Sequence, residues 1–166
     1  METKKFDIKK LVYAAVCLAL AMVLPLITGQ IPEIGKSLQP MHIAIFLCGF
    51  LCGWQYGAVV GFVAPYLRFM IFGKPNIYPD AVGMSLELLT YGLIVGLMYK
   101  KLPKKNVYIY ASLLIAMVCG RLVWGCARFV MAGISGTSFP FSAFISGAIT
   151  TALPGIALHI ILVPLA

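Results

Sequence analysis

The stretch PMHIAIFLCGFLCGWQYGAVVGFVAPYLRFMIFG, residues 40–73, contains two apolar runs separated by a short aromatic segment. Its one formally charged residue is Arg68, so neither run has the polar face of a water-exposed helix. Residues 41–53 and 57–72 are each predicted to form a helix. Residues 54–56 are predicted to form the turn, because tryptophan and tyrosine favour membrane interfaces. The stretch therefore predicts a helical hairpin within a lipid bilayer.

The rest of the chain has the same character. Hydrophobic residues make up 61% of its 166 positions and charged residues only 11%, whereas a soluble domain carries about 25% charged residues. The apolar/polar alternation of a membrane barrel is absent from the sequence. We therefore predict an all-α integral membrane protein, a single domain over residues 1–166 built as a bundle of six transmembrane helices. The expected helices are residues 10–28, 41–53, 57–72, 81–99, 107–130 and 141–166, with Pro164 breaking the last.

The second helix, residues 41–53, is the one whose length fits a transmembrane span least well. Thirteen residues rise only ~20 Å, less than the ~30 Å apolar core of a bilayer. The sequence leaves three readings open: a half-buried element, a tilted one, or one that borrows residues from the preceding loop.

Lysine distribution predicts the orientation. If the N-terminus is inside, eight lysines lie on the cytoplasmic side and only Lys36 and Lys74 lie outside. Both termini are then cytoplasmic, and the first helix is expected to be retained instead of cleaved as a signal peptide. This distribution also explains the net charge of +8 without a nucleic-acid partner. The eight inner lysines are Lys4, Lys5, Lys9, Lys10, Lys100, Lys101, Lys104 and Lys105.

Small residues four apart allow helix backbones to approach closely. In the third and fourth helices such residues favour internal packing. In the first helix, Ala15 and Ala19 form an A-x-x-x-A pair, for which a surface that docks another protein competes with internal packing. The small residues of the other two helices are Gly57, Gly61, Ala64, Gly92 and Gly96.

Ionisable residues inside the helices need a cavity or a partner, because a charge in lipid is costly. At ~1.5 Å per residue, Arg68 lies ~6 Å, Glu87 ~9 Å and Arg121 ~14 Å below the outer ends of their helices. Arg128 lies ~3 Å below the same end of its helix, and His42 opens the second helix on that side. All five are therefore predicted to gather in the outer half of the bundle.

Arg121, Trp124 and Arg128 share one helical face. Two guanidinium groups that flank an indole favour an anion with an apolar or planar part, since arginine suits carboxylate or phosphate. An alternative is a buried structural ion pair between Glu87 and Arg121, with Arg68 and Arg128 snorkelling to the interface.

No reaction is indicated. The sequence contains no phosphate-binding loop, zinc-helix motif or Ser-His-Asp set, so we expect neither an enzyme nor a cofactor or metal site. Cys48 and Cys52 are predicted to be packing residues, and His159 to snorkel near the inner interface. A small membrane protein with an outward-facing site and no energy source suggests a binding subunit that depends on partners.

The chain resembles the substrate-binding S components of energy-coupling factor (ECF) vitamin transporters, closest to the pantothenate- and folate-type group. The resemblance rests on residues 40–73, on ELLTYGLIVGLMY (87–99), on GRLVWG (120–125) and on the Ala15/Ala19 pair. It covers nearly the whole chain.

The resemblance implies a six-helix membrane bundle, in the plasma membrane of a bacterium, that captures a vitamin from outside. Such a protein topples within the bilayer once docked on a transmembrane coupling subunit driven by two ATPases. Pantothenate is the first candidate and folate the second. The implied docking residues are Ala15 and Ala19, and the implied lid is residues 29–39. The expected substrate-binding residues are His42, Arg68, Glu87, Tyr91, Arg121, Trp124 and Arg128.

Two other functions remain open. A stand-alone carrier coupled to protons or ions would use Glu87 as its titrating group. A membrane enzyme or assembly factor is disfavoured because no catalytic constellation is present.

Overall fold

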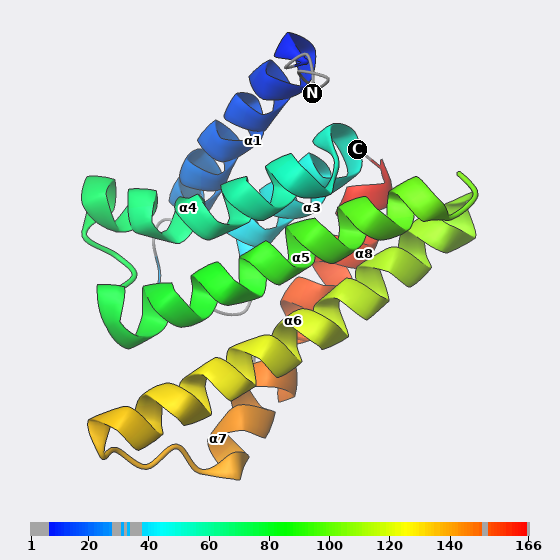
Figure 1. Ribbon diagram of the computed structural model, residues 1–166. Helices are drawn as coiled ribbons and strands as arrows, with labels where there is room; N and C mark the ends of the chain where they lie inside the picture. Colours follow the sequence, from blue (N-terminus) through cyan, green and yellow to red (C-terminus); the bar gives the residue numbers. More distant parts are fainter. Residues whose placement is uncertain (1–6, 28–30, 32, 34–37, 151–152, 166) are drawn as a thin grey trace, which may run out of the picture.

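The computed structural model describes residues 7–27, 31, 33, 38–150 and 153–165. Within these ranges the chain is almost entirely helical (Figure 1), as its long apolar runs require in lipid. The elements are α1 (Ile8–Ile27), α3 (Pro40–Cys52), α4 (Trp54–Phe72), the short segment η1 (Ile77–Ala81), which is kinked at the extended Tyr78, α5 (Val82–Lys101), α6 (Asn106–Ser135), α7 (Phe141–Ile145), the π-helix η2 (Ser146–Thr150) and α8 (Leu153–Leu165).

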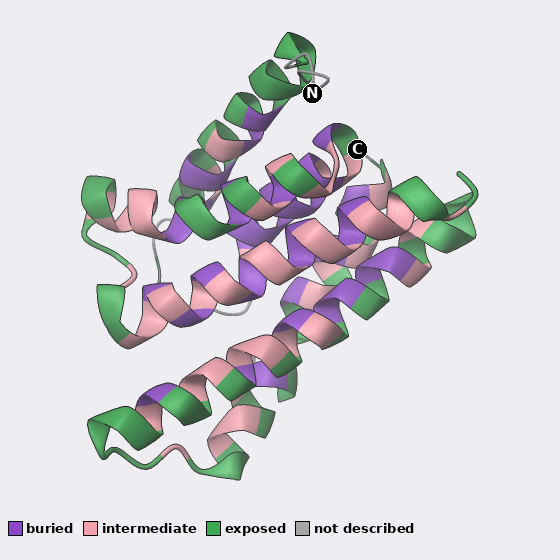
Figure 2. Cartoon of the chain, viewed as in Figure 1, coloured by how far each residue is buried: buried purple, intermediate pink, exposed green. Residues whose placement is uncertain are grey.

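Five segments of the described chain are long and apolar enough to cross a bilayer. Large apolar side chains on their outer faces are exposed, as lipid-facing residues would be. The exposed positions are most extensive on α1 and on the end of α6 that leads to α7 (Figure 2). The predicted all-helical membrane architecture is confirmed. The five segments are Ile8–Ile27, Trp54–Phe72, Ile77–Lys101, Asn106–Ser135 and Phe141–Leu165.

The sixth, shorter helix is α3, and it lies inside the bundle. Most of its 13 residues are buried (Figure 2), and α1, α4, α5 and α8 all pack against it. Because its neighbours cover it on several sides, it needs neither a polar face nor the full thickness of the bilayer. Its length therefore suits a core helix.

The turn between α3 and α4 differs from the prediction. Gly53, at a left-handed φ of 94°, makes the reversal by itself, a conformation that costs glycine little. Residues 54–56 are already the first turn of α4. The two helices thus share one end. Since α4 has 19 residues and α3 has 13, the first residues of α3 lie ~9 Å short of the far end of α4 at ~1.5 Å per residue.

Each end of the bundle carries its own set of connections. The first residues of α1, the last of α8, the α3–α4 connection and the α5–α6 connection lie at one end, which we name the terminal end (Figure 1). The last residues of α1 and the connections from α4 to α5 and from α6 to α7 lie at the other end, named the cavity end. The lysines described at the terminal end are exposed. They are Lys9, Lys10, Lys100, Lys101, Lys104 and Lys105, whereas Lys4, Lys5 and Lys36 lie outside the described residues.

Helices α4 and α5 meet through glycine, as their small residues predict. A Cβ on Gly57 would lie 2.9 Å from the Gly92 carbonyl oxygen, and a Cβ on Gly92 would overlap the Gly57 backbone. Three cysteines, Cys17, Cys48 and Cys52, are buried in the core that α1 and α3 form, which confirms the packing role predicted for the latter two.

Two boundaries correct the sequence-based expectation. Helix α6 continues to Ser135, five residues beyond the predicted end, and stops at Gly136, whose φ of 67° is left-handed. The last segment is not one helix but α7, η2 and α8. Pro164 lies within α8 and does not end it before Leu165.

Candidate binding site

A cavity of about 620 Å³ opens at the cavity end, above the recessed start of α3. Six of the seven predicted binding residues line it, and Tyr91 lies directly behind them. The predicted binding residues did not include four polar lining residues, namely Gln39, Lys74, Asp80 and Ser146. The six predicted residues are His42, Arg68, Glu87, Arg121, Trp124 and Arg128.

Glu87 is the centre of the polar network. Its side chain is 2% exposed, and its Oε1 accepts a 2.5 Å hydrogen bond from the hydroxyl of Tyr91, one turn later on α5. Arg121 Nη1 lies 3.1 Å from the same oxygen, and His42 Nε2 lies 3.6 Å from it. The structural ion pair that the sequence left as an alternative is therefore present.

Arg121 has a second partner. Its Nη2 donates a 2.5 Å hydrogen bond to Gln39 Oε1, which connects α6 to the start of α3. Gln39 has a left-handed backbone, with φ at 47°, and precedes Pro40, the first residue of α3. A proline at the first helical position marks the residue before it as the cap. Gln39 is also the last residue of the segment that the resemblance implied as a lid.

Arg128 is also paired. Its Nη1 lies 2.9 Å from Asp80 Oδ1, at side-chain exposures of 22% and 45%. The guanidinium lies over the rings of Trp124 and Phe139, 5.7 and 5.6 Å from their centroids. Because α6 extends to Ser135, Arg128 is ~10 Å below the end of its helix instead of ~3 Å. Asp80 therefore holds it at the rim of the cavity, and it does not snorkel alone.

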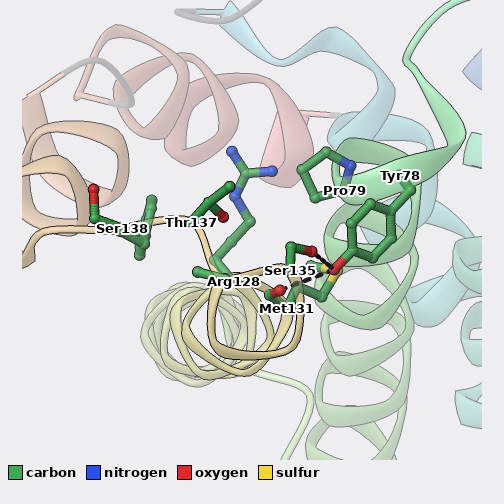
Figure 3. A pocket seen from close by; sticks show the side chains of 9 residues that line it. Tyr78, Pro79, Arg128, Met131, Ser135, Thr137 and Ser138 are labelled. Atoms are coloured by element: carbon green, nitrogen blue, oxygen red, sulfur yellow. Dashed lines mark hydrogen bonds between the residues drawn. The ribbon is translucent and has the colours of Figure 1, made fainter.

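A smaller pocket of about 160 Å³ lies beside this pair (Figure 3). Tyr78, from η1, donates a 2.9 Å hydrogen bond to the carbonyl oxygen of Met131. The hydroxyls of Tyr78 and Ser135 share another of 2.7 Å. Tyr78 and Asp80 thus fasten the α4–α5 connection to the last turns of α6.

Arg68 has a different environment. It approaches the ring of Phe72 at 5.6 Å, and its Nη1 is buried without a hydrogen-bond partner in the described part of the chain. The ion pairs found there involve other arginines. Arg68 is therefore the guanidinium of the cavity with no counter-ion among the described residues.

His159 overturns an expectation. It is 2% exposed, and its ring is stacked on that of His42 at 5.8 Å with an interplanar angle of 14°. Its Nε2 lies 3.2 Å from the carbonyl oxygen of Gln39. It does not snorkel at an interface, because α8 is a separate helix beside α3 and not the end of one continuous helix from residue 141.

The predicted pairing of arginines with an indole is present. Arg121 and Arg128 lie 6.0 and 5.7 Å from the ring centroid of Trp124. Phe144 stacks on the indole at 6.3 Å, and a Cβ on Gly147 would come within 2.9 Å of it. The indole is therefore packed as part of the wall.

The cavity suits an anion. Four cationic side chains line it against two carboxylates, and both carboxylates already have arginine partners. No group of three or more His, Cys, Asp or Glu side chains is placed to hold a metal ion in the residues that the structure describes. The predicted lid, residues 29–39, lies largely outside the described residues. The four cations are Arg68, Lys74, Arg121 and Arg128.

The alanines of α1 divide between two faces. Ala14 and Ala21 are buried against the bundle, whereas Ala15 and Ala19 are exposed on the opposite side. The A-x-x-x-A pair is thus not used for packing within the described chain.

Comparison with known proteins agrees with this architecture. The model of the ECF transporter substrate-specific component family matches residues 9–166. Neither the curated proteins nor the solved structures include a match. The family match spans nearly the whole chain, including every helix that lines the cavity. The chain therefore belongs to the family of substrate-specific components of ECF transporters.

Proposed function

We propose that this ECF substrate-specific component captures a small carboxylate in the cavity between α3, α4, α5 and α6. Pantothenate is the first candidate and folate the second. Members of the family work with a transmembrane coupling module and ATPase modules, so this chain itself needs no energy source. Capture is then a binding event, and uptake follows only in the assembled transporter.

The observation that carries the proposal is that Nη1 of Arg68 is buried without a hydrogen-bond partner, and that the guanidinium has no counter-ion among the described residues. A buried donor without a partner is costly, and a charged one more so. Arg121 and Arg128 already have carboxylate partners. Of the other two cations in the lining, Lys74 is exposed to solvent, so Arg68 is the one proposed to receive the carboxylate of a ligand. The lining as a whole retains an excess of positive charge, which also favours an anionic ligand.

Pantothenate suits the cavity better than folate. It carries one carboxylate, which matches the one guanidinium of the lining that has no counter-ion among the described residues, whereas folate carries two. Folate also has a pteridine ring that needs an open aromatic face, and the indole of Trp124 already contacts Phe144, Arg121 and Arg128. The cavity of about 620 Å³ accommodates a small ligand with room for water.

The proposed setting is the plasma membrane of a bacterium, with the cavity end outside. The lysines described at the terminal end support this orientation through the positive-inside rule. Lys74 is the described lysine of the cavity end.

The alternative of a carrier that acts alone would use Glu87 as its titrating group. Arg121, Tyr91 and His42 converge on this carboxylate, an arrangement that suits a fixed counter-ion. Uptake into vesicles that contain this chain alone, driven by a pH gradient, would support the carrier. Uptake only in the presence of the coupling and ATPase modules supports the binding subunit.

The direct test is equilibrium binding of pantothenate and of folate to the purified chain in detergent, without nucleotide. We expect saturable binding of pantothenate, weakened at least tenfold in Arg68→Met, because loss of one charge-assisted hydrogen bond costs ~1.5–3 kcal/mol. Lys104→Met is the matched control, since this lysine lies at the terminal end over Tyr99. Equal affinity of the Arg68 variant and the control would refute the proposed site.

A further inference from the structure

His42 is the one described side chain of the cavity floor whose polar atoms are buried and lack hydrogen bonds on both sides of the ring. It is 3% exposed and lines the cavity. Neither Nδ1 nor Nε2 has a hydrogen-bond partner within the described residues. Buried polar groups in native proteins are nearly always satisfied, so this ring indicates a missing partner.

The surroundings of the ring define which nitrogen is available. Nε2 faces Glu87 Oε1 at 3.6 Å, slightly beyond hydrogen-bond length, and this carboxylate oxygen is an acceptor towards which an N–H at Nε2 would point. An N–H at Nε2 leaves Nδ1 of the neutral ring with a lone pair. Nδ1 therefore needs a donor.

Neighbouring rings hold His42 in place. His159 stacks on it at 5.8 Å, and Tyr91 packs at 5.3 Å with an interplanar angle of 55°. His159 is itself engaged with the carbonyl oxygen of Gln39. The imidazole therefore stays against the cavity, and its unsatisfied nitrogen cannot turn to solvent.

We infer that Nδ1 of His42 accepts a hydrogen bond from a hydroxyl or amide N–H of the captured molecule. The ligand class is then a carboxylate that also carries an uncharged hydrogen-bond donor. This inference deepens the proposed function, because it concerns the same cavity and adds a second recognition point to Arg68. Simple fatty carboxylates, which have no such donor, are excluded by it.

The test compares pantothenate with 3,3-dimethylbutanoyl-β-alanine, the analogue that lacks both hydroxyls but keeps the carboxylate and the amide. A second analogue carries an N-methyl group on the amide. Binding of all three is measured for the wild type and for His42→Phe, which keeps a ring between His159 and Tyr91. His42→Asn, which retains a polar atom near the position of Nδ1, is the partial-rescue variant.

Wild-type protein is expected to bind pantothenate at least tenfold more tightly than one of the two analogues. In His42→Phe this ratio should fall to near one, and in His42→Asn it should recover in part. A ratio unchanged in His42→Phe would overturn the inference, as would wild-type protein that binds all three equally. Lys104→Met should bind all three compounds as the wild type does. This result shows that a loss of affinity in a His42 variant does not arise from the preparation of variant protein.

A wrong choice of pantothenate as substrate can be distinguished from a wrong role for His42. If the wild type does not bind pantothenate, that assignment fails, and both proteins are exposed to a bacterial small-molecule extract and analysed by mass spectrometry. An acid with a hydroxyl or N–H, enriched at least tenfold on the wild type over His42→Phe, supports the role of His42. Equal retention by both proteins, an acid without such a donor, or no retained acid contradicts it.

Discussion

Arg121 of α6 and Glu87 of α5 form a buried ion pair, with Nη1 and Oε1 3.1 Å apart. The pair bridges two helices that diverge towards the cavity end (Figure 1), and the bond from Arg121 to Gln39 extends the bridge to α3. It therefore closes the floor of the cavity. Because the guanidinium of Arg121 is already neutralised by Glu87, we assign capture of an anionic ligand to Arg68.

Removal of either partner of this pair should destabilise the protein. Glu87→Leu leaves a buried guanidinium unpaired and Arg121→Met leaves a buried carboxylate unpaired, each at a cost of ~3–5 kcal/mol. The double variant has neither charge and should be more stable than both single variants. Thermal unfolding of the purified chain in detergent measures this coupling. A double variant whose losses simply add would show that the two residues do not act as a pair.

Glycine at the contact of α4 with α5 should be indispensable. Gly92→Ala places a Cβ onto the backbone of Gly57, which forces the helices apart and should lower stability by at least ~1–3 kcal/mol. Gly133→Ala is the matched control, because it also lies within a helix and its Cβ would meet nothing within 4 Å. Thermal unfolding of the two variants in detergent measures the difference in their stability. Equal stability would contradict the close packing.

Tyr78 should control how quickly the ligand exchanges. Tyr78→Phe removes the hydrogen bonds to the carbonyl oxygen of Met131 and to Ser135 and loosens the α4–α5 connection at the rim (Figure 3). We expect association and dissociation of pantothenate to quicken together, with the dissociation constant changed less than about threefold. Stopped-flow binding measures both rates. Ser135→Ala, which spares the bond to Met131, should have the smaller effect, and unchanged rates in both variants would exclude the role.

Ala15 and Ala19 should serve assembly instead of capture. Leucine at both positions enlarges an exposed surface of α1, so the purified chain should bind pantothenate as before and copurify with the coupling subunit at least tenfold less. Ala14→Leu is the contrasting variant, because that residue is buried and should lose ~1–3 kcal/mol of stability by overpacking. Normal assembly of the Ala15/Ala19 variant would remove these residues from the docking surface.

The helices and the polar cluster were predictable because each has a local signal. Apolar runs and glycine or proline boundaries place α1, α3, α4 and α5 within a few residues. The cost of charge in lipid identified Glu87 and Arg121 as members of one site. The end of α6 was misplaced because Gly133 suggests a loop, although an exposed glycine is tolerated in a helix.

The residues that sequence reasoning missed or misplaced depend on how distant segments meet. Asp80 and Tyr78 lie in a connection whose course no periodicity describes, and they reach α6 only in three dimensions. His159 was misplaced because depth was counted along one continuous helix, whereas η2 separates α7 from α8. The depth of a residue is thus predictable only while its helix is unbroken.

The most direct test of the central claim is mass spectrometry of the small molecule that copurifies with the wild-type chain and with Arg68→Met from the same host. We expect a single carboxylate, pantothenate, on the wild type and at most a tenth of that occupancy on Arg68→Met. A neutral or cationic molecule on the wild type, or the same anion retained equally by Arg68→Met, would contradict it.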